Sequence, residues 1–252
     1  MKKCLLLIVA VLTALTAVGQ TQHFFTSDKL SSNQITAICQ DKTGYIWVGT
    51  EYGLNKYDGY RFTNYLYTPE DKASLSSNVI SFLFVDAQGH LWVGTQKGLD
   101  YYDDVNDRFV HVTLEGAKAA PRINHIVQED EGHLLVGTAG YGLFRLDTET
   151  FKSGMLEGYA KGDNNYFSHI FIDSEGAFWK SGHGSSVTRR SPKGELEEFD
   201  SPCGTVTDFV EYEGGVLMVC IHGLLYYRNG VISSDFIDTE RIGARNCCSV
   251  WP

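Results

Sequence analysis

The sequence predicts an all-β protein, a β-propeller of four-stranded blades, with five blades and the start of a sixth. Three observations predict this fold. The 252-residue chain contains 26 glycines and 13% aromatic residues, a composition that favours short strands joined by tight turns. A motif recurs about every 44 residues, which is a spacing typical of propeller blades. Each repeat also holds four short apolar segments, one for each strand of a blade.

The repeated motif is clearest in residues 41–58 and 86–103, which read DKTGYIWVGTEYGLNKYD and DAQGHLWVGTQKGLDYYD. A third copy begins at Glu129, a fourth at Asp173 and a fifth at Glu211, and the last two match more weakly. One glycine marks the same turn in every copy: Gly44, Gly89, Gly132, Gly176 and Gly214. The intervals between these glycines are 45, 43, 44 and 38 residues. Such spacing indicates one structural unit repeated along the chain.

Each part of the repeat predicts a local structure. An Asp at the first position and a Gly at the fourth are typical of a type I turn. An apolar stretch such as 35–39 precedes this turn, and Ile46–Val48 follows it, with further strands predicted near Leu54 and at 61–65. Because Ile46–Val48 does not alternate with polar residues, a sheet buried on both faces is favoured. We therefore interpret the turn aspartates as turn residues rather than acid catalysts. The tryptophans of the motif are interpreted as packing between blades rather than as a ligand cage: Trp47, Trp92 and Trp179.

The first 19 residues have the pattern of a secretory signal peptide. Lys2 and Lys3 form a positive start, residues 5–18 are almost entirely apolar, and small residues precede a cleavage site before Gln20. An uncleaved membrane anchor is the alternative, although this run is shorter than the ~20 residues that cross a bilayer. We therefore predict export and removal of residues 1–19.

The repeat divides the exported chain into successive units. Residues 20–27 are predicted to form an orphan outer strand that completes the last blade. The units that follow are blade 1 (28–70), blade 2 (71–115), blade 3 (116–160), blade 4 (161–201), blade 5 (202–240) and the truncated start of blade 6 (241–252). Residues 245–252 align with 33–40, so the chain is predicted to stop within the first strand of a sixth blade. We expect residues 20–252 alone to form an open arc that self-associates and binds no sugar with useful affinity.

Composition and motifs argue against several classes of function. The formal net charge is −10, and an acidic protein without a basic stripe repels phosphates, so no nucleic acid partner is expected. The sequence contains no G-x-S-x-G, H-E-x-x-H or Walker pattern. The cysteines show no C-x-x-C spacing, and residues 103–107 lack the glycine and glutamate of a calcium loop. We therefore predict a chain that is not an enzyme, with no catalytic residues, no metal and no cofactor.

Residues 41–58 and 86–103, preceded by Leu-Ser-Ser-Asn at 30–33 and 75–78, resemble the two-component regulator propeller repeat. In that family the repeat builds the periplasmic sensor region of hybrid two-component sensor histidine kinases from glycan-degrading Gram-negative bacteria. The resemblance extends over residues 28–230 and weakens toward the end. It implies a seven-bladed ring, of which the five blades here would be an incomplete part.

The resemblance also implies a larger protein. Its other parts would be a second stacked propeller, an inner-membrane helix, a histidine kinase, a receiver and a DNA-binding helix-turn-helix, and the full-length protein would be a homodimer. None of these catalytic parts is present in the 252 residues. On this basis we expect an N-terminal periplasmic domain that senses an oligosaccharide and controls polysaccharide-utilisation genes. Its other partners would be the missing regions of the same protein.

The loops between second and third strands, and those joining successive blades, are expected to gather on one face around the central channel. Tyrosine, asparagine and lysine can stack on a sugar or hydrogen-bond to it, although such loop residues can equally be variable surface positions. The candidate ligand-binding residues on this face are Tyr52, Lys97, Tyr141, His183, His222, Asn33, Asn78, Asn124 and Asn165.

Two alternatives to a sensor stay open at this point. One is a free-standing secreted propeller that binds carbohydrate or protein. The other is a polysaccharide-active enzyme, which would need paired carboxylates on the recognition loops. Those loops hold Glu51, Asp71 and Asp163 without a recurring pair, so binding is favoured over catalysis.

Overall fold

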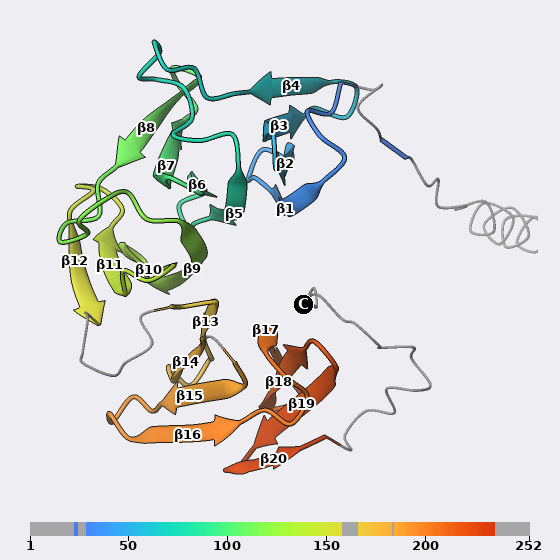
Figure 1. The fold of residues 1–252 in the computed structure, drawn as a ribbon, viewed down its shortest axis with the longest axis vertical. Coiled ribbons are helices and arrows are strands. Elements are labelled where there is room, and N and C mark those ends of the chain that lie inside the picture. Colours follow the sequence, from blue (N-terminus) through green and yellow to red (C-terminus); the bar gives the residue numbers. More distant parts are fainter. Residues whose placement is uncertain (1–22, 25–28, 158–165, 183, 235–252) are drawn as a thin grey trace, which may run out of the picture.

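The computed structural model describes residues 23–24, 29–157, 166–182 and 184–234, and this part of the chain contains strands and turns but no helix. The strands form five four-stranded sheets, each made of four consecutive strands in chain order (Figure 1). Neighbouring strands in every sheet are antiparallel. The predicted all-β propeller fold is therefore confirmed, and we number the sheets as blades 1 to 5.

All strands are short, from three to eight residues. Blade 1 consists of β1 (Ile35–Gln40), β2 (Ile46–Thr50), β3 (Gly53–Tyr57) and β4 (Phe62–Tyr65). Blade 2 consists of β5 (Ile80–Val85), β6 (Leu91–Thr95), β7 (Gly98–Asp103) and β8 (Arg108–Val112). Blade 3 consists of β9 (Ile123–Asp130), β10 (His133–Thr138), β11 (Leu143–Asp147) and β12 (Ser153–Glu157). Blade 4 consists of β13 (His169–Ile172), β14 (Phe178–Ser181), β15 (Ser186–Arg190) and β16 (Leu196–Asp200). Blade 5 consists of β17 (Val206–Tyr212), β18 (Gly215–Cys220), β19 (Gly223–Arg228) and β20 (Val231–Ser233).

The turn between the first and second strands is built in the same way in blades 1, 2 and 4. In blade 1, Oδ1 of Asp41 accepts two backbone N–H groups of its own turn, at 2.9 and 3.1 Å. Gly44, at the fourth position, has a φ of 91°, a left-handed conformation that glycine adopts without strain. Oδ2 of Asp41 accepts a hydrogen bond from Nε1 of Trp47 at 2.7 Å. The same bond joins Asp86 to Trp92 and Asp173 to Trp179, at 2.9 and 2.8 Å. The motif Asp thus shapes the turn and anchors the buried Trp.

Figure 1 shows the blades following one another in an arc, with the first strand of each blade on the inside and the fourth on the outside. The first strands pack against one another in order, β1 with β5, β5 with β9, β9 with β13, and β13 with β17. Between β17 and β1 the ring of described strands is open. This open arrangement fits the predicted incomplete propeller.

The three largest hydrophobic clusters each lie between two blades. Trp47 of blade 1 packs with Ile80 and Tyr102 of blade 2. Trp92 joins blade 2 to blade 3, and Trp179 joins blade 4 to blade 5. All three tryptophans are completely buried, so their predicted role in packing between blades is confirmed.

One close contact recurs at the first three interfaces between blades. Gly49 of the Val-Gly-Thr motif faces Ile80 of the next blade, and a Cβ on Gly49 would lie 2.6 Å from Cγ2 of Ile80. Gly94 faces Ile123, and Gly137 faces Phe167, with a Cβ at 3.0 Å in both cases. These distances leave too little room for a side chain. The motif glycine is therefore needed for the close approach of successive blades.

A β-bulge sets which side chains reach these interfaces. In β5 the register shifts between Ile80 and Phe82. Ile80 and Leu83, three residues apart, consequently both enter the cluster shared with blade 1. Blades 1 and 5 carry the same shift, after Ile35 and Val206.

Blade 5 departs from the four-residue turn that the motif predicts. Tyr212 pairs directly with Gly215, and the two residues between them, Glu213 and Gly214, have φ values of 45° and 77°. Two consecutive positive φ values are typical of the two-residue type I′ hairpin. Glu211 accepts a hydrogen bond from the backbone N–H of Ser174 in blade 4, at 2.6 Å, and so links two blades.

Three predicted segments lie wholly or mostly outside the described residues: the signal peptide (1–19), the orphan strand (20–27) and the start of blade 6 (241–252). Of the orphan strand, the ring of Phe24 packs on Tyr57 and Phe62 of blade 1, with centroids 4.9 and 5.3 Å apart. Its completion of the last blade stays a prediction. Within the described ranges, no helix has the length and apolar character needed to cross a membrane.

Candidate functional site

The β2–β3 and β6–β7 turns present two of the predicted ligand-binding residues in the same way. Thr50 accepts a hydrogen bond from the backbone N–H of Tyr52 at 3.0 Å and donates one to the carbonyl of Gly53 at 2.9 Å. Thr95 makes the same two bonds around Lys97, at 3.1 and 3.0 Å. Because the threonine holds the turn, the side chain of the following turn residue can project into solvent, and Tyr52 is 57% exposed.

The loop that joins blade 1 to blade 2 lies beside these turns. The side-chain oxygen of Asn78 accepts a hydrogen bond from the backbone N–H of Tyr67 at 2.7 Å. The backbone carbonyl of Asn78 accepts one from the backbone N–H of Gly53 at 2.6 Å. Asn78 therefore fixes the path of the loop beside Tyr52. Asn33, its counterpart before blade 1, is exposed.

Three of the remaining predicted residues lie in blades 3 and 5, where each has contacts of its own. The side-chain amide of Asn124 donates to the carbonyl of Phe167 at 2.9 Å, which joins blade 3 to blade 4. Tyr141 is half-buried against the core between blades 2 and 3. His222 is exposed, with its backbone N–H bonded to the carbonyl of Cys203 at 3.0 Å. His183 and Asn165 lie outside the described residues.

A pocket of about 300 Å³ opens beside Lys97. It lies between the β6–β7 turn, the outer strand β8 and the loop that leads to blade 3. Its polar lining residues are Ser76, Lys97, Asp100, His111 and Thr113, and its apolar ones include Leu99, Val112, Leu114, Ala117 and Pro121. Of these residues the sequence pattern predicts Lys97 as a ligand-binding residue, but neither Asp100 nor His111. The signal was available, because Asp100 places a carboxylate where the first repeat has Asn55, in a strand predicted to be buried.

Asp100 is completely buried beneath this pocket. Its Oδ2 accepts a hydrogen bond from the backbone N–H of Ser76 at 2.8 Å, whereas its Oδ1 has no hydrogen-bond partner among the described residues. Burial raises the pKa of Asp100 to about 6, against the opposing effects of the Ser76 bond and of His111. Nε2 of His111 lies 4.0 Å from Oδ1 of Asp100 and 2.8 Å from the carbonyl of Ser74.

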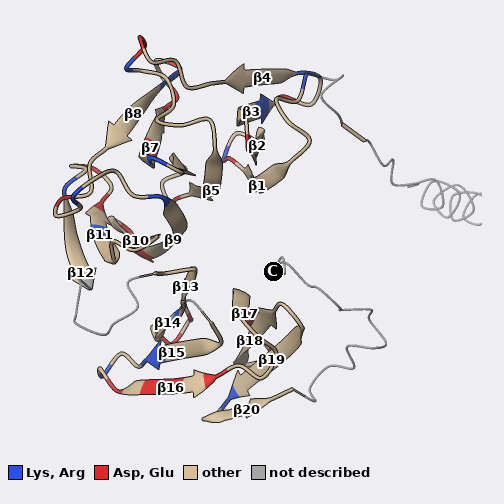
Figure 2. Cartoon of the chain, in the orientation of Figure 1, with Lys and Arg blue, Asp and Glu red and all other residues tan. Residues whose placement is uncertain are grey.

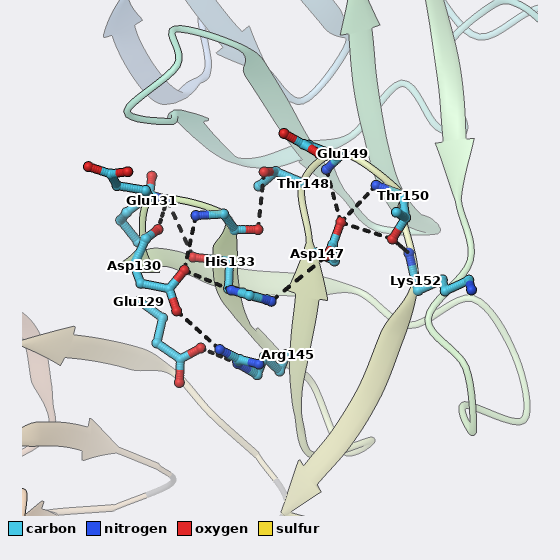
Figure 3. A network of polar contacts seen from close by, with 12 residues as sticks. Glu129, Asp130, Glu131, His133, Arg145, Asp147, Thr148, Glu149, Thr150 and Lys152 are labelled. Carbon is cyan, nitrogen blue, oxygen red and sulfur yellow. Dashed lines mark hydrogen bonds and ion pairs between the residues drawn. The ribbon is translucent and has the colours of Figure 1, made fainter.

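At the turn between β9 and β10 of blade 3, a network of charged side chains stands in place of the Asp–Trp pair of the motif (Figure 3). Asp130 accepts a hydrogen bond from Nδ1 of His133 at 2.7 Å and pairs with Arg145 at 3.1 Å. Arg145 also pairs with Glu129, and Nε2 of His133 lies 3.8 Å from Asp147. These contacts join side chains of a single blade, so the network stabilises the turn. Across the described ranges, no three His, Cys, Asp or Glu side chains gather as a metal site requires.

Comparison with known proteins identifies the repeat. Residues 29–52 and 74–97 match the sequence profile of the family described as two component regulator propeller. Histidine kinase P4 of Formosa agariphila is 46% identical over 54 residues, which are 21% of this chain and 4% of that protein. The chain therefore spans a small fraction of this curated relative.

Solved structures with the same fold include extracellular domains of two proteins from B. thetaiotaomicron described as hybrid two component systems. Their TM-scores are 0.53 and 0.54, both at 18% identity, and the matches cover 82% and 86% of this chain but 35% and 37% of those chains. A catalytically inactive virginiamycin B lyase from Staphylococcus aureus with quinupristin has a TM-score of 0.65 at 16% identity, covering 87% of this chain and 74% of the lyase.

At identities below one fifth, these likenesses establish the propeller fold and leave the ligand and the activity open. The sequence matches at residues 29–52 and 74–97 coincide with the two clearest copies of the motif. The chain is therefore an all-β propeller protein in which two repeats match the two-component regulator propeller family.

Proposed function

We propose that this chain is the ligand-sensing propeller of a hybrid two-component regulator, located in the periplasm, and that its ligand is an oligosaccharide. The observation that carries the proposal is the pairing of regulator propeller repeats with the fold of extracellular sensor domains. Export fits the signal-peptide pattern of residues 1–19. The role in the cell would be to control genes for the use of one polysaccharide.

The described surface supports recognition of an uncharged or weakly charged ligand. Figure 2 shows Lys and Arg spread over several blades rather than gathered on one, while the outer strand β16 carries Glu197, Glu198 and Asp200. Such a distribution offers no track for a polyanion. The turns that present Tyr52 and Lys97 instead offer one aromatic ring and one ammonium group within a repeated framework, as sugar recognition requires.

A deletion of the gene in its own bacterium tests this function. Growth and transcript levels are compared between the parent and the deletion strain on a series of single polysaccharides. We expect the deletion to abolish the induction of degradation genes on one polysaccharide and to leave the others unchanged. Unaltered induction on every polysaccharide that the parent uses would refute the proposal.

A binding measurement separates an oligosaccharide sensor from a sensor of simple sugars. Because the recognition loops differ from blade to blade, an asymmetric oligosaccharide can contact several of them at once. We expect the complete product of the gene to bind such an oligosaccharide at least about tenfold more tightly than its constituent monosaccharides, a difference of about 1.4 kcal/mol. Calorimetry with both ligands checks this, and equal affinities would show that one blade alone makes all the contacts.

A further inference from the structure

The pocket beside Lys97 combines an apolar wall with polar side chains that have unused bonding capacity. The backbone N–H of Lys97 is used in the β6–β7 turn, but its ammonium group makes no ion pair or hydrogen bond with the described residues. Leu99 and Leu114 form a buried apolar wall nearby. A ligand here can therefore bury carbon surface and still hydrogen-bond to the ammonium group.

His111 presents the second polar group, and its tautomer follows from its neighbours. A carbonyl oxygen only accepts hydrogen bonds, so the 2.8 Å contact with Ser74 requires a proton on Nε2. The carboxylate of Asp100, 4.0 Å away, favours the same tautomer. The neutral ring then keeps an acceptor lone pair on Nδ1, and this nitrogen has no hydrogen-bond partner in the described part of the chain. The ring is 44% exposed and lines the pocket.

The donor on Lys97 and the acceptor on His111 define the ligand chemistry. A hydroxyl group can accept from the ammonium and a neighbouring hydroxyl can donate to Nδ1. A purely anionic ligand can only accept from the ammonium, and a purely apolar ligand satisfies neither group. The volume of about 300 Å³ is at the lower end of small-molecule sites. A single polyhydroxylated ring with an apolar C–H face fits both the size and the lining.

We propose that this pocket of blade 2 binds one neutral sugar ring, with Lys97 donating to one hydroxyl and Nδ1 of His111 accepting from another. The inference rests on the proposed sensing of an oligosaccharide and assigns one ring of it to a defined place. All lining residues lie between Ser76 and Pro121. The pocket is therefore complete within blade 2 and its link to blade 3, and closure of the propeller ring is not required. This differs from the expectation that the isolated arc binds no sugar with useful affinity.

Amine footprinting tests the site in the whole exported chain, whatever its state of association. The protein is acetylated at lysines with and without D-glucose, D-galactose, D-mannose or D-xylose, and the rates at individual lysines are measured by mass spectrometry. We expect one of these sugars to slow the acetylation of Lys97. At a concentration ten times Kd the slowing should be about tenfold, because protection scales as 1 + [L]/Kd. Lys193, in an exposed turn of blade 4, is the internal control and should be unaffected.

The variant His111→Asn supplies the second arm. Blade 1 has Asn64 at this position, so the substitution is one that the repeat already accommodates, and a melting curve verifies the fold. It replaces the ring acceptor by a shorter amide, which in blade 1 donates to Asn55 and to the carbonyl of Lys29, and we expect Kd from the Lys97 footprint to rise roughly five- to tenfold. Lys193→Ala, which removes one exposed positive charge elsewhere, should leave Kd unchanged. Equal protection by glycerol, or protection of Lys193 together with Lys97, would refute a site for a sugar ring.

The outcomes separate this inference from the proposed function. If oligosaccharides bind but leave Lys97 reactive, and His111→Asn binds them as the parent does, the pocket is not a sugar site although the sensor function stands. If neither the four monosaccharides nor any oligosaccharide binds, both proposals fail.

Discussion

Blades 1 and 2 are nearly the same sequence in different surroundings. Ile80 and Leu83 of β5 are 0% and 6% exposed because they pack against blade 1, whereas their counterparts Ile35 and Ile38 of β1 are 43% and 47% exposed. Both pairs follow the same bulge. The repeat therefore determines where these side chains point, and a neighbouring blade determines whether they are buried. Stability in such an array depends on interfaces more than on single units.

The same two blades also differ in one buried polar pair. In blade 1 the oxygen of Asn55 accepts hydrogen bonds from Ser31 and Asn64, at 2.8 and 2.6 Å, and its amide donates to a carbonyl at 2.9 Å. In blade 2 Asp100 keeps the bond to the loop, but its other oxygen is unpaired beside His111. An amide satisfies this buried position better than an ionised carboxylate does. Asp100 therefore makes blade 2 less stable than an Asn would at the place where the blade has a pocket.

The largest expected effect comes from truncating the interface side chain. Ile80→Ala should lower the free energy of unfolding by about 2–5 kcal/mol, because it leaves a cavity against Gly49. Ile35→Ala, the matched change in blade 1, should cost less than about 1 kcal/mol, because its side chain is already in contact with solvent. Urea unfolding of both variants checks this. Equal losses would mean that the face of blade 1 is covered in solution.

A second effect concerns the pH dependence of stability and extends the comparison to blades 3 and 4. These blades have His125 and His169 at the position where blades 1 and 2 have Ala37 and Phe82. The two rings lie 5.2 Å apart, and neither Nδ1 has a partner in the described chain. Burial lowers the pKa of His169 to about 4 and that of His125 well below its ordinary value of 6.5. The unfolded chain therefore takes up protons first as the pH falls.

The stability that the protein gains by keeping these histidines neutral is complete above about pH 6.5 and is lost as the pH falls toward about 4. For His169 the loss is about 2–3 kcal/mol. His169→Phe copies blade 2 and should remove this part of the acid sensitivity. Unfolding curves of variant and parent across this range provide the measurement. Parallel pH profiles would show that His169 takes up its proton as readily in the folded protein as in the unfolded chain.

The buried pair of blade 2 should give an effect of opposite sign. The pKa of Asp100 is raised from 3.8 to about 6, so the stability that it contributes is complete below about pH 4 and is lost as the pH rises through 6. Asp100→Asn should therefore stabilise the protein by about 2 kcal/mol at about pH 8 and by almost nothing at about pH 4. Asn55→Asp in blade 1 should destabilise at the higher pH. Thermal unfolding at the two pH values decides, and a loss of stability on Asp100→Asn would contradict the comparison.

The smallest expected effect concerns the motif glycine. Gly49→Ala should cost about 1–2 kcal/mol, because the new methyl group would meet Ile80 and force blades 1 and 2 apart. Gly154→Ala in β12 is the control, since a Cβ there has no atom within 4 Å, and its effect should stay within about 0.5 kcal/mol. Urea midpoints of the two variants measure the difference. A neutral Gly49→Ala would mean that the blades can separate without cost.

The candidate site was only partly accessible from the sequence. The sequence predicts Lys97 and Tyr52 because a turn residue between two strands of the repeat must project, whatever the packing. Asn124 is predicted to lie on the ligand face, and its amide donates a hydrogen bond to blade 4. The sequence does not show which neighbour a side chain meets. The pairing of Asp100 with His111 depends on the register between β7 and β8, and that register is set by the length of the turn joining them.

The repeat by itself determined the blade, its four strands, its Asp-x-x-Gly turn and the buried Trp, because each follows from local turn chemistry and from apolar spacing. Tertiary structure alone decided that the motif glycine serves the approach of the next blade, that Asp41 binds Trp47, and that Ile35 is exposed while Ile80 is buried. It also decided that Glu211 of blade 5 accepts a hydrogen bond from blade 4. These features depend on atoms from another blade or from six or more residues away along the chain, and a local pattern does not specify such distances.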